Sequence, residues 1–573
     1  MKKIILALIL ALFTSLLITP TTYAETAEEY FNQGNKMYKE KNFEEAIAVY
    51  TKAIELNPNK PSYFYNRGIS YANLNQYDKA IADYTKAIEL KSNNPSYFYN
   101  RGGSYGYIKQ YDKAIADFTK TIELNPNDPS CFNNRGNSYH DLKQYDKAIA
   151  DYTKAIELNP NDPSYFNNRG ISYANLNQYD KAIADYTKAI ELNPNKPSYF
   201  NNRGNSYHAL NHYDKAITDH IKAIELDPNN PSYFYNRGNS YHALKQYDKA
   251  IADYTKAIEL SPNDPSYFNN RGVSYAKISQ YDKAITDYTK AIELKSNNPS
   301  YFYNRGNSYH DLKQYDKAIA DYTKAIELKP SIPNYFYNRG GSYGYIKQYD
   351  KAIIDFTKAI ELVPHDPSYF YYRGTSYHTL NQDDKAISDY TKAIELNPTD
   401  PSYFYNRGIS YQNLNQDDKA IVDYTKAIEL NPTDPDYFNN RGNSYRRLNQ
   451  NDKAIADYTQ AIELTPNKSV YFNNRGISYR NLSQYDKAIT DYTKAIELKP
   501  NNPSYFYNRG ISYAKLNQYD KAIADYTKAI ELKPSDPDYF YNRGIAYGKL
   551  KQYGKANADF SKANELKPNS APN

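Results

Sequence analysis

The chain has no tryptophan, two methionines and a single cysteine among its 573 residues. One cysteine cannot close a disulfide within the chain, and it lacks the neighbours that a cysteine metal or redox motif requires. We therefore expect Cys131 to be a half-buried free thiol. The sequence also contains no glycine-rich phosphate loop and no nucleophile placed beside a base. These absences predict no catalytic residues, no enzyme activity, no metal and no cofactor.

Neither sign of charge prevails. The 71 lysines and arginines exceed the 65 aspartates and glutamates by only 6. Because both signs are interspersed along the chain, the small positive excess predicts no nucleic-acid partner.

Long apolar runs are absent after the first 24 residues. Residues 1–24 begin with lysines, continue with an apolar run from Ile4 to Ile18 and end at Ala24. This order is typical of a secretory signal peptide, and the run is shorter than the roughly 20 residues that a membrane-spanning helix needs. We expect cleavage after Ala24, bacterial-type export to the periplasm or the extracellular space, and no transmembrane segment afterwards. The alternative is that the leader is retained as an N-terminal anchor.

The most prominent feature that is present is a repeat. Glycine recurs every 34 residues from Gly34 through Gly68 to Gly544, sixteen times without insertion or deletion. A fixed period of this length indicates stacked helical hairpins. We divide residues 27–570 into sixteen repeats with positions 1 to 34, which leaves a tail at residues 571–573. The repeats begin at residues 27, 61, 95, 129, 163, 197, 231, 265, 299, 333, 367, 401, 435, 469, 503 and 537.

Each repeat contains two amphipathic segments. In the repeat that begins at Pro61, apolar side chains follow helical spacing up to Leu74 and again over residues 77–88. Asn94 at the end of this repeat has the position of a helix cap before the next proline. Gly68 and Ala80 are small where the two helices would cross, and aromatic residues flank them, which predicts a closely packed hairpin.

This pattern resembles the tetratricopeptide repeat, whose seven signature positions are filled here by Phe132, Gly136, Tyr139, Ala148, Tyr152, Ala155 and Pro160. The resemblance covers residues 27–570. It implies an all-α, right-handed superhelical solenoid of sixteen 34-residue helix–turn–helix repeats, with the first helix of each hairpin lining a concave groove. It also implies a non-enzymatic scaffold for protein–protein interaction.

The chain departs from the general pattern of that family at position 7, where arginine replaces leucine. A guanidinium beside a core is costly unless it is paired, so we expect Arg67 to pair with Asp83 of the same repeat, and likewise in the other repeats. The first repeat lacks both groups, having Gln33 and Val49.

Two regions differ from the average repeat. In the last repeat, Asn557 and Asn564 replace isoleucines, which predicts a polar end face. Position 17, elsewhere aromatic, holds Asp383, Asp417 and Asn451 in three consecutive repeats. We expect these repeats to lose aromatic packing in the turn and to form the softest segment of the chain.

Position 6 predicts a binding surface. It is asparagine in fifteen repeats, and an amide can both donate to and accept from a peptide backbone. The resulting ladder resembles that in the superhelix of O-linked N-acetylglucosamine transferase. The alternative is that the asparagines bridge neighbouring helices. The candidate residues are Asn134, Asn168, Asn202, Asn236, Asn270 and Asn304.

Position 12 and its neighbours supply further candidates. His140, His208, His242 and His310 occupy position 12 and are expected to form hydrogen bonds in the groove rather than to bind a metal. Arg446, Arg447 and Arg480 make the groove positive towards the C-terminus, where we expect either an anionic ligand or a solvated surface.

The two-carboxylate clamp of chaperone-binding tetratricopeptide domains is not expected, because its lysines are missing; position 5 holds Phe31 or Tyr65 instead. The predicted ligands are therefore extended peptide segments or partner proteins. The alternative is an envelope polysaccharide, favoured if the tyrosines at position 5 are exposed, or a passive spacer role.

Overall fold

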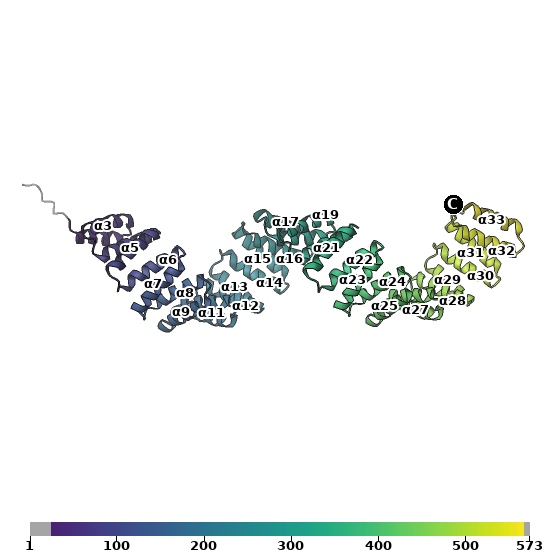
Figure 1. The fold of residues 1–573 in the computed structure, drawn as a ribbon, viewed down its shortest axis with the longest axis horizontal. Coiled ribbons are helices and arrows are strands. Elements are labelled where there is room, and N and C mark those ends of the chain that lie inside the picture. The colour runs from purple at the N-terminus through teal and green to yellow at the C-terminus, as the bar shows by residue number, and fades with distance from the viewer. Residues whose placement is uncertain (1–24, 567–573) are drawn as a thin grey trace, which may run out of the picture. The chain divides into compact units, whose positions relative to one another are not determined.

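A computed structural model describes residues 25–566 of the chain. The predicted signal peptide (1–24) and tail (571–573) lie outside these residues. The described part contains helices and turns and no strand, as the sequence predicted (Figure 1). It divides between Gln280 and Tyr281 into two compact units, each a run of antiparallel helical hairpins in chain order.

Unit one contains both helices of each of the first seven repeats and the first helix of the eighth. Its helices are α2 (Ala27–Lys39), α3 (Phe43–Leu56), α4 (Pro61–Asn73), α5 (Tyr77–Leu90), α6 (Pro95–Tyr107), α7 (Tyr111–Leu124), α8 (Pro129–Asp141), α9 (Tyr145–Leu158), α10 (Pro163–Asn175), α11 (Tyr179–Leu192), α12 (Pro197–Ala209), α13 (Tyr213–Leu226), α14 (Pro231–Ala243), α15 (Tyr247–Leu260) and α16 (Pro265–Lys277).

Unit two begins with the second helix of the eighth repeat and contains the remaining eight repeats. Its helices are α17 (Tyr281–Leu294), α18 (Pro299–Asp311), α19 (Tyr315–Leu328), α20 (Pro333–Tyr345), α21 (Tyr349–Leu362), α22 (Pro367–Thr379), α23 (Asp383–Leu396), α24 (Pro401–Asn413), α25 (Asp417–Leu430), α26 (Pro435–Arg447), α27 (Asn451–Leu464), α28 (Ser469–Asn481), α29 (Tyr485–Leu498), α30 (Pro503–Lys515), α31 (Tyr519–Leu532), α32 (Pro537–Lys549) and α33 (Tyr553–Leu566).

Local chemistry sets the helix boundaries. The predicted caps are present: the Asn94 side chain accepts a hydrogen bond from the Ser96 backbone N–H, and Asp128 accepts one from Ser130. The turn inside each hairpin places position 15 in the left-handed region, as at Asn75 with φ 57°. That residue is asparagine, lysine or serine in every described turn, and its conformation was not foreseen from the sequence.

Each hairpin closes around one aromatic ring. Tyr84 and Ala80 are buried, and a Cβ added to Gly68 would lie 2.7 Å from the Tyr84 ring. The predicted packing of small against large residues is therefore present, and the ring at position 24 is the group that covers the glycine. Hairpins then join through clusters such as Phe64, Ala87 and Tyr97, which span consecutive repeats.

The arginine at position 7 forms the predicted ion pair. Arg67 donates from Nε and Nη2 to the two carboxylate oxygens of Asp83 at 2.8 and 2.7 Å. Its Nη1 donates to Thr51 Oγ1 of the preceding repeat at 2.9 Å, a contact that the sequence analysis missed. This clasp recurs in both units, as at Arg169 and Arg543.

The polar residues at position 17 form contacts with the next repeat in place of aromatic ones. Asp383 and Asp417 are each 5 % exposed, whereas tyrosines at this position, such as Tyr77, are only half-buried. Asp383 accepts a hydrogen bond from Asn413, and Asp417 Oδ2 pairs with Arg447 at 3.3 Å, whereas Asp417 Oδ1 is buried without a partner within residues 25–566. Polar contacts between repeats therefore replace the aromatic ones, and the soft segment stays a prediction.

The sixth repeat buries a side chain with two unsatisfied polar atoms. His220 takes the place of the ring at position 24 and is 0 % exposed, and both ring nitrogens lack a hydrogen-bond partner within residues 25–566. Burial lowers its pKa to about 3. The next residue, Ile221, stands where a threonine would accept from Arg237. Because of these two substitutions, we expect the α12–α13 hairpin to be less stable than hairpins that carry tyrosine and threonine at these positions.

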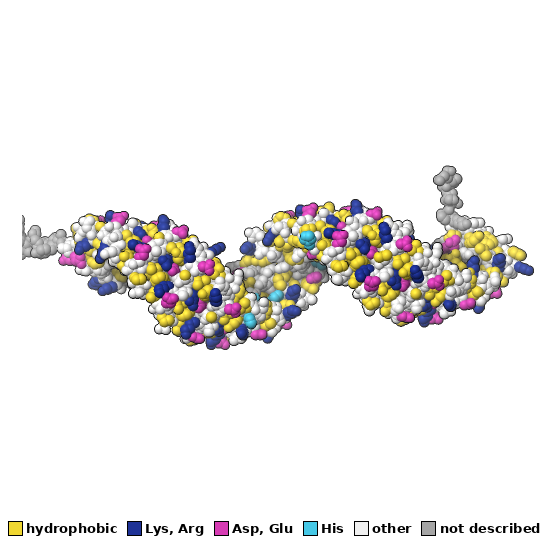
Figure 2. All heavy atoms as spheres, turned by 60° about the horizontal axis from the view of Figure 1, so that its bottom comes forward, with side chains coloured by type: hydrophobic (Ala, Val, Ile, Leu, Met, Phe, Trp, Pro, Cys, Tyr) yellow, Lys and Arg dark blue, Asp and Glu magenta, His cyan; other side chains and the backbone are white. Residues whose placement is uncertain are grey.

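Two smaller predictions have clear outcomes. Asn557 and Asn564 are exposed on α33, as expected for a polar end face. Cys131 is a free thiol but is fully buried rather than half-buried, and burial raises its pKa to about 12. Over the visible surface of both units, positive and negative side chains are interspersed (Figure 2).

Breaking the clasp on one side tests its contribution. In R169Q the buried Asp185 loses its partner, so we expect the opening free energy of α10 and α11 to fall by about 3 kcal/mol. The double variant R169Q/D185V reproduces the pair found in the first repeat and should lose less than half of that. Hydrogen exchange of these helices measures both, and equal protection in the parent and the single variant would contradict the clasp.

Substitution of His220 tests the weak hairpin. H220Y supplies a hydroxyl to Asn205, as Tyr254 does to Asn239, and removes the unsatisfied nitrogens. The opening free energy of α12 and α13, measured by hydrogen exchange, should therefore rise by about 1–3 kcal/mol. The folded pKa lies below the unfolded value, so the unfolded chain binds more protons below pH ~6.5.

In the parent, the opening free energy of α12 and α13 should therefore fall by about 2 kcal/mol between neutral pH and pH 5. H220F, which cannot titrate, should abolish this acid-dependent loss without restoring the hydroxyl contact. A parent whose α12–α13 exchange, corrected for intrinsic rates, is independent of pH would exclude a buried neutral imidazole.

Candidate functional site

The predicted groove corresponds to a row of pockets between successive first helices. We call this surface the first-helix face; it comprises positions 6, 9, 12 and 13 of the first helices and the adjoining positions 17 and 24 of the second helices. Three pockets of about 290, 380 and 300 Å³ lie on it in unit one, each in a similar register of the repeat. They are centred near Gly103, Ile171 and Asn239.

The asparagines at position 6 bridge repeats. Asn168 donates from Nδ2 to Asn133 Oδ1 and Asn137 Oδ1 of the preceding repeat, at 3.1 and 3.4 Å. Asn134 donates to the Tyr99 hydroxyl at 2.9 Å. These asparagines therefore bridge neighbouring helices, as in the alternative given for position 6, and the ladder is partly structural.

The other asparagines of the predicted ladder lie at the same position. Asn202 and Asn236 donate to asparagines at position 5, Asn270 donates to the Tyr235 hydroxyl, and Asn304 is half-buried on α18.

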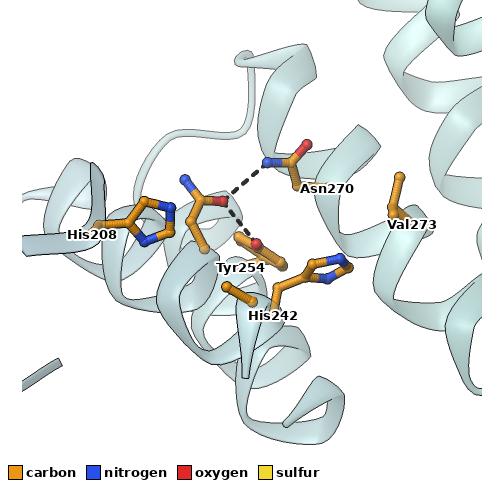
Figure 3. Close-up of a pocket in the computed structure, with 7 residues that line it drawn as sticks. His208, His242, Tyr254, Asn270 and Val273 are labelled. Atoms are coloured by element: carbon orange, nitrogen blue, oxygen red, sulfur yellow. Dashed lines mark hydrogen bonds between the residues drawn. The ribbon is translucent and has the colours of Figure 1, made fainter. Parts of the chain in front are cut away.

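The asparagines at position 9 are oriented towards the open face. Asn239 Oδ1 accepts from the Tyr254 hydroxyl at 2.8 Å and from Asn270 Nδ2 at 3.1 Å (Figure 3). With its oxygen held by two donors, the Asn239 Nδ2 group keeps both hydrogens free of any partner among the described residues. The sequence analysis noted that position 9 varies but did not identify this role.

The same arrangement recurs where position 9 is asparagine and position 24 is tyrosine. Its members are Asn35 with Tyr50, Asn137 with Tyr152, Asn307 with Tyr322 and Asn443 with Tyr458. The signal in the sequence was the joint occurrence of these two residue types, fifteen positions apart.

The histidines at position 12 form hydrogen bonds between repeats. His208 and His242 lie on either side of the pocket in Figure 3. His208 Nδ1 is 3.0 Å from Ser240 Oγ, and that hydroxyl already donates to the Asn236 carbonyl. Since serine has one hydroxyl proton, we expect Nδ1–H to be the donor and Nε2 to be left as an acceptor.

The other position 12 histidines share this contact. His140 Nδ1 lies 2.9 Å from Ser172 Oγ, and His310 Nδ1 lies 2.9 Å from Ser342 Oγ. Burial lowers the pKa of all four rings. A cationic histidine stretch would therefore require a pH below the ordinary titration range of histidine.

The three candidate anion-binding arginines are not equivalent. Arg447 pairs with Asp417, which neutralises its charge. Arg446 donates to the Tyr458 hydroxyl at 3.3 Å, and Arg480 donates to Asn508 Oδ1 at 3.0 Å. The structure thus leaves two uncompensated cations on adjacent first helices, α26 and α28.

Within residues 25–566, no cluster of three or more histidine, cysteine, aspartate or glutamate side chains has the arrangement of a metal site. Over the same residues, every helix is too short or too polar to cross a bilayer.

Paired helices in an unbroken 34-residue period, with pockets along the first helices, define an all-α repeat solenoid. The chain belongs to the tetratricopeptide repeat family. Family models described as "Tetratricopeptide repeat" or "TPR repeat" together match most of residues 34–570. The first of these matches residues 61–94, 95–128, 129–162, 163–196, 299–332, 401–434 and 435–468. Such a scaffold is suited to protein–protein interaction and is generally non-catalytic.

Solved structures of the same class resemble parts of the chain. YrrB, described as a TPR protein with an unusual peptide-binding site, is 27% identical over 31% of this chain and 92% of its own, with a TM-score of 0.29. A TPR protein from Parabacteroides merdae ATCC 43184 is 20% identical over 43% and 98%, with a TM-score of 0.36. The Cut9–Hcn1 hetero-tetramer is 16% identical over 87% and 99%, with a TM-score of 0.33. A search of curated proteins finds no match.

The histidine assignment is testable by NMR. With ring-labelled histidine, we expect His208 and His242 to be the Nδ1–H tautomer at pH 7.5 and to titrate below pH ~6.5, because burial disfavours the charged ring. The same resonances in the denatured chain should titrate near ~6.5. An Nε2–H tautomer in the folded protein would contradict the serine contacts.

Proposed function

We propose that this protein is a non-enzymatic scaffold that binds extended polypeptide segments along the first-helix face. Its membership in the tetratricopeptide repeat family supports an interaction role. The observation that carries the more specific proposal is the orientation of the asparagines at position 9.

These amides supply hydrogen-bond donors at fixed places. The Asn137 and Asn239 oxygens accept from a tyrosine of the same repeat and from an asparagine of the next repeat, so their N–H groups are available to a ligand. An extended peptide presents backbone carbonyls that such donors can bind without reading the sequence. Nearby Nε2 atoms of His208 and His242 supply acceptors for peptide N–H groups. Donors and acceptors therefore occur together, as a backbone ligand requires.

We propose that the scaffold acts in the cell envelope or outside the cell. The order of residues 1–24, lysines followed by an apolar run and small residues, supports export. The partners would then be envelope or secreted proteins.

An envelope polysaccharide remains the second candidate, because Tyr107 and Tyr345 are 73% and 65% exposed and sugars stack on aromatic rings. The position 5 tyrosines give it less support. Tyr65, for example, packs against Tyr97 of the next repeat at 4.8 Å and accepts a hydrogen bond from Asn100.

Affinity capture tests the proposal. Residues 25–573 would be used as bait for envelope and secreted extracts, beside the variant N137I/N239I. Isoleucine is the residue that Ile69 and Ile171 supply at position 9, so this variant should fold. We expect the parent to retain a defined polypeptide that the variant retains at least about tenfold less, because two backbone hydrogen bonds are lost.

A matched control is K154Q/K256Q, which changes exposed lysines of α9 and α15 and should capture as the parent does. Position 6 is a poorer target, because its asparagines join repeats even where position 9 is isoleucine, as Asn202 does through Asn167. Retention of the same polypeptides by N137I/N239I would remove the amides from recognition, and capture of glycan alone would favour the polysaccharide.

A further inference from the structure

A pocket on the first-helix face of unit one has an unusual floor. Gly103 and Gly106 occupy positions 9 and 12 of α6, and a Cβ added to either would meet no atom within 4 Å. Other repeats place Ile69 and Ala72 there. The missing side chains leave a hollow of about 290 Å³ lined by Phe118, Tyr107 and Asn134 among others.

The walls of this hollow are aromatic. Tyr107 is 73% exposed and stacks on Tyr77 of the preceding repeat, with ring centroids 4.7 Å apart and planes at 7°. Phe118 lies below it, edge-on to Tyr99 at 5.9 Å. The one charged group in the lining is Asp141, and no lysine or arginine contributes, which disfavours an anionic ligand.

Unit two contains a near-copy of the same segment. Residues 338–355 repeat residues 100–117 except that Ile354 replaces Ala116. Gly341 and Gly344 are again free of neighbours, and Tyr345 again stacks on the preceding tyrosine, Tyr315, at 4.8 Å and 1°. The two segments are therefore two versions of one structure.

The copies differ in what lies over the floor. Position 6 of the following repeat is Asn134 in unit one and Tyr372 in unit two. The Tyr372 ring stacks on Phe356, the counterpart of Phe118, at 6.1 Å and 26°. It also contacts Tyr337, the counterpart of Tyr99, edge-on at 5.6 Å. In unit two, the chain itself thus places a tyrosine ring against Phe356 and Tyr337, while the space over Gly341 and Gly344 stays open.

We propose that the pocket over Gly103, Gly106 and Phe118 is a recognition site for a tyrosine or phenylalanine side chain of the bound polypeptide. Tyr372 shows which group these surfaces accept, and Asn134 is too short to reach the same place. The inference rests on the proposed function: the position 9 amides hold the peptide backbone, and this pocket selects one side chain. It gives the otherwise sequence-independent groove a preferred register.

Two short peptides provide the test. Binding of Ac-Gly-Tyr-Gly-NH2 and Ac-Gly-Ala-Gly-NH2 to residues 25–573 would be measured by ligand-observed NMR titration, with N-acetylglucosamine trimer as the sugar probe. We expect the tyrosine peptide to bind at least about tenfold more tightly than the alanine peptide, the gain of one buried, stacked ring.

Matched variants locate the site. N134Y places in unit one the residue that unit two already carries, and G103I/G106A restores the side chains of the second repeat. Both should fold, and both should weaken the tyrosine peptide about tenfold. Y372N should open the copy in unit two and add one binding equivalent per chain.

Equal binding by the parent, N134Y and G103I/G106A, or no added equivalent in Y372N, would overturn the assignment. Binding of the sugar but not the tyrosine peptide, lost in N134Y, would assign the pocket to carbohydrate instead. Polypeptide capture separates the two proposals: capture that depends on Asn137 and Asn239 but survives N134Y removes only the pocket, whereas a parent that captures no polypeptide removes both.

Discussion

The close approach of the two helices in each hairpin is the constraint on which the other features depend. Because position 8 is glycine, the ring at position 24 lies against bare backbone, as Tyr84 does against Gly68. The tyrosine ring at position 24 is buried between the two helices, and its hydroxyl reaches the first-helix face. There it fixes the amide at position 9, as Tyr254 fixes Asn239. Core packing and the candidate binding surface are thus two ends of one side chain.

One contact between consecutive repeats, that of position 17 with position 13, is made by different types of side chain. Position 17 of one repeat meets position 13 of the next as a tyrosine stack at Tyr77 and Tyr107, and as an ion pair at Asp417 and Arg447. Asn451 and Asn481 form the amide version of the same contact. The site can therefore change from apolar to polar without a change in backbone, provided that both partners change together.

The fold could be predicted almost entirely from the sequence, because its determinants are local and repeated sixteen times. Helix starts followed from Asn94 or Asp128 before proline, and the Arg67–Asp83 pair followed from the cost of an unpaired guanidinium. The candidate site was harder, since it combines bonds within a repeat, such as that of Tyr254 with Asn239, and bonds between repeats, such as that of Asn270 with Asn239. The acceptors of Asn168 depend on how successive helices are offset, and residue spacing in the sequence does not give this offset.

The same reasoning applies to position 17. The sequence analysis read Asp383 only as the loss of a ring. One partner, His378, lies in the same repeat and was not recognised, and the other, Asn413, becomes adjacent only when hairpins stack. Conversely, the sequence does not report that both His220 nitrogens lack a partner; this follows from the surroundings of the buried ring in the structure.

The arginine clasp also bears on how such a chain changes in length. An arginine such as Arg169 binds an aspartate of its own repeat and a threonine of the repeat before, and other junctions within a unit use the same pair of complementary groups. Excision or duplication of 34 residues within a unit would bring together an equivalent arginine and threonine at the new junction. Unequal recombination between repeats can therefore lengthen or shorten the protein in whole modules while preserving its ion pairs, except beside Ile221, where the threonine is already missing.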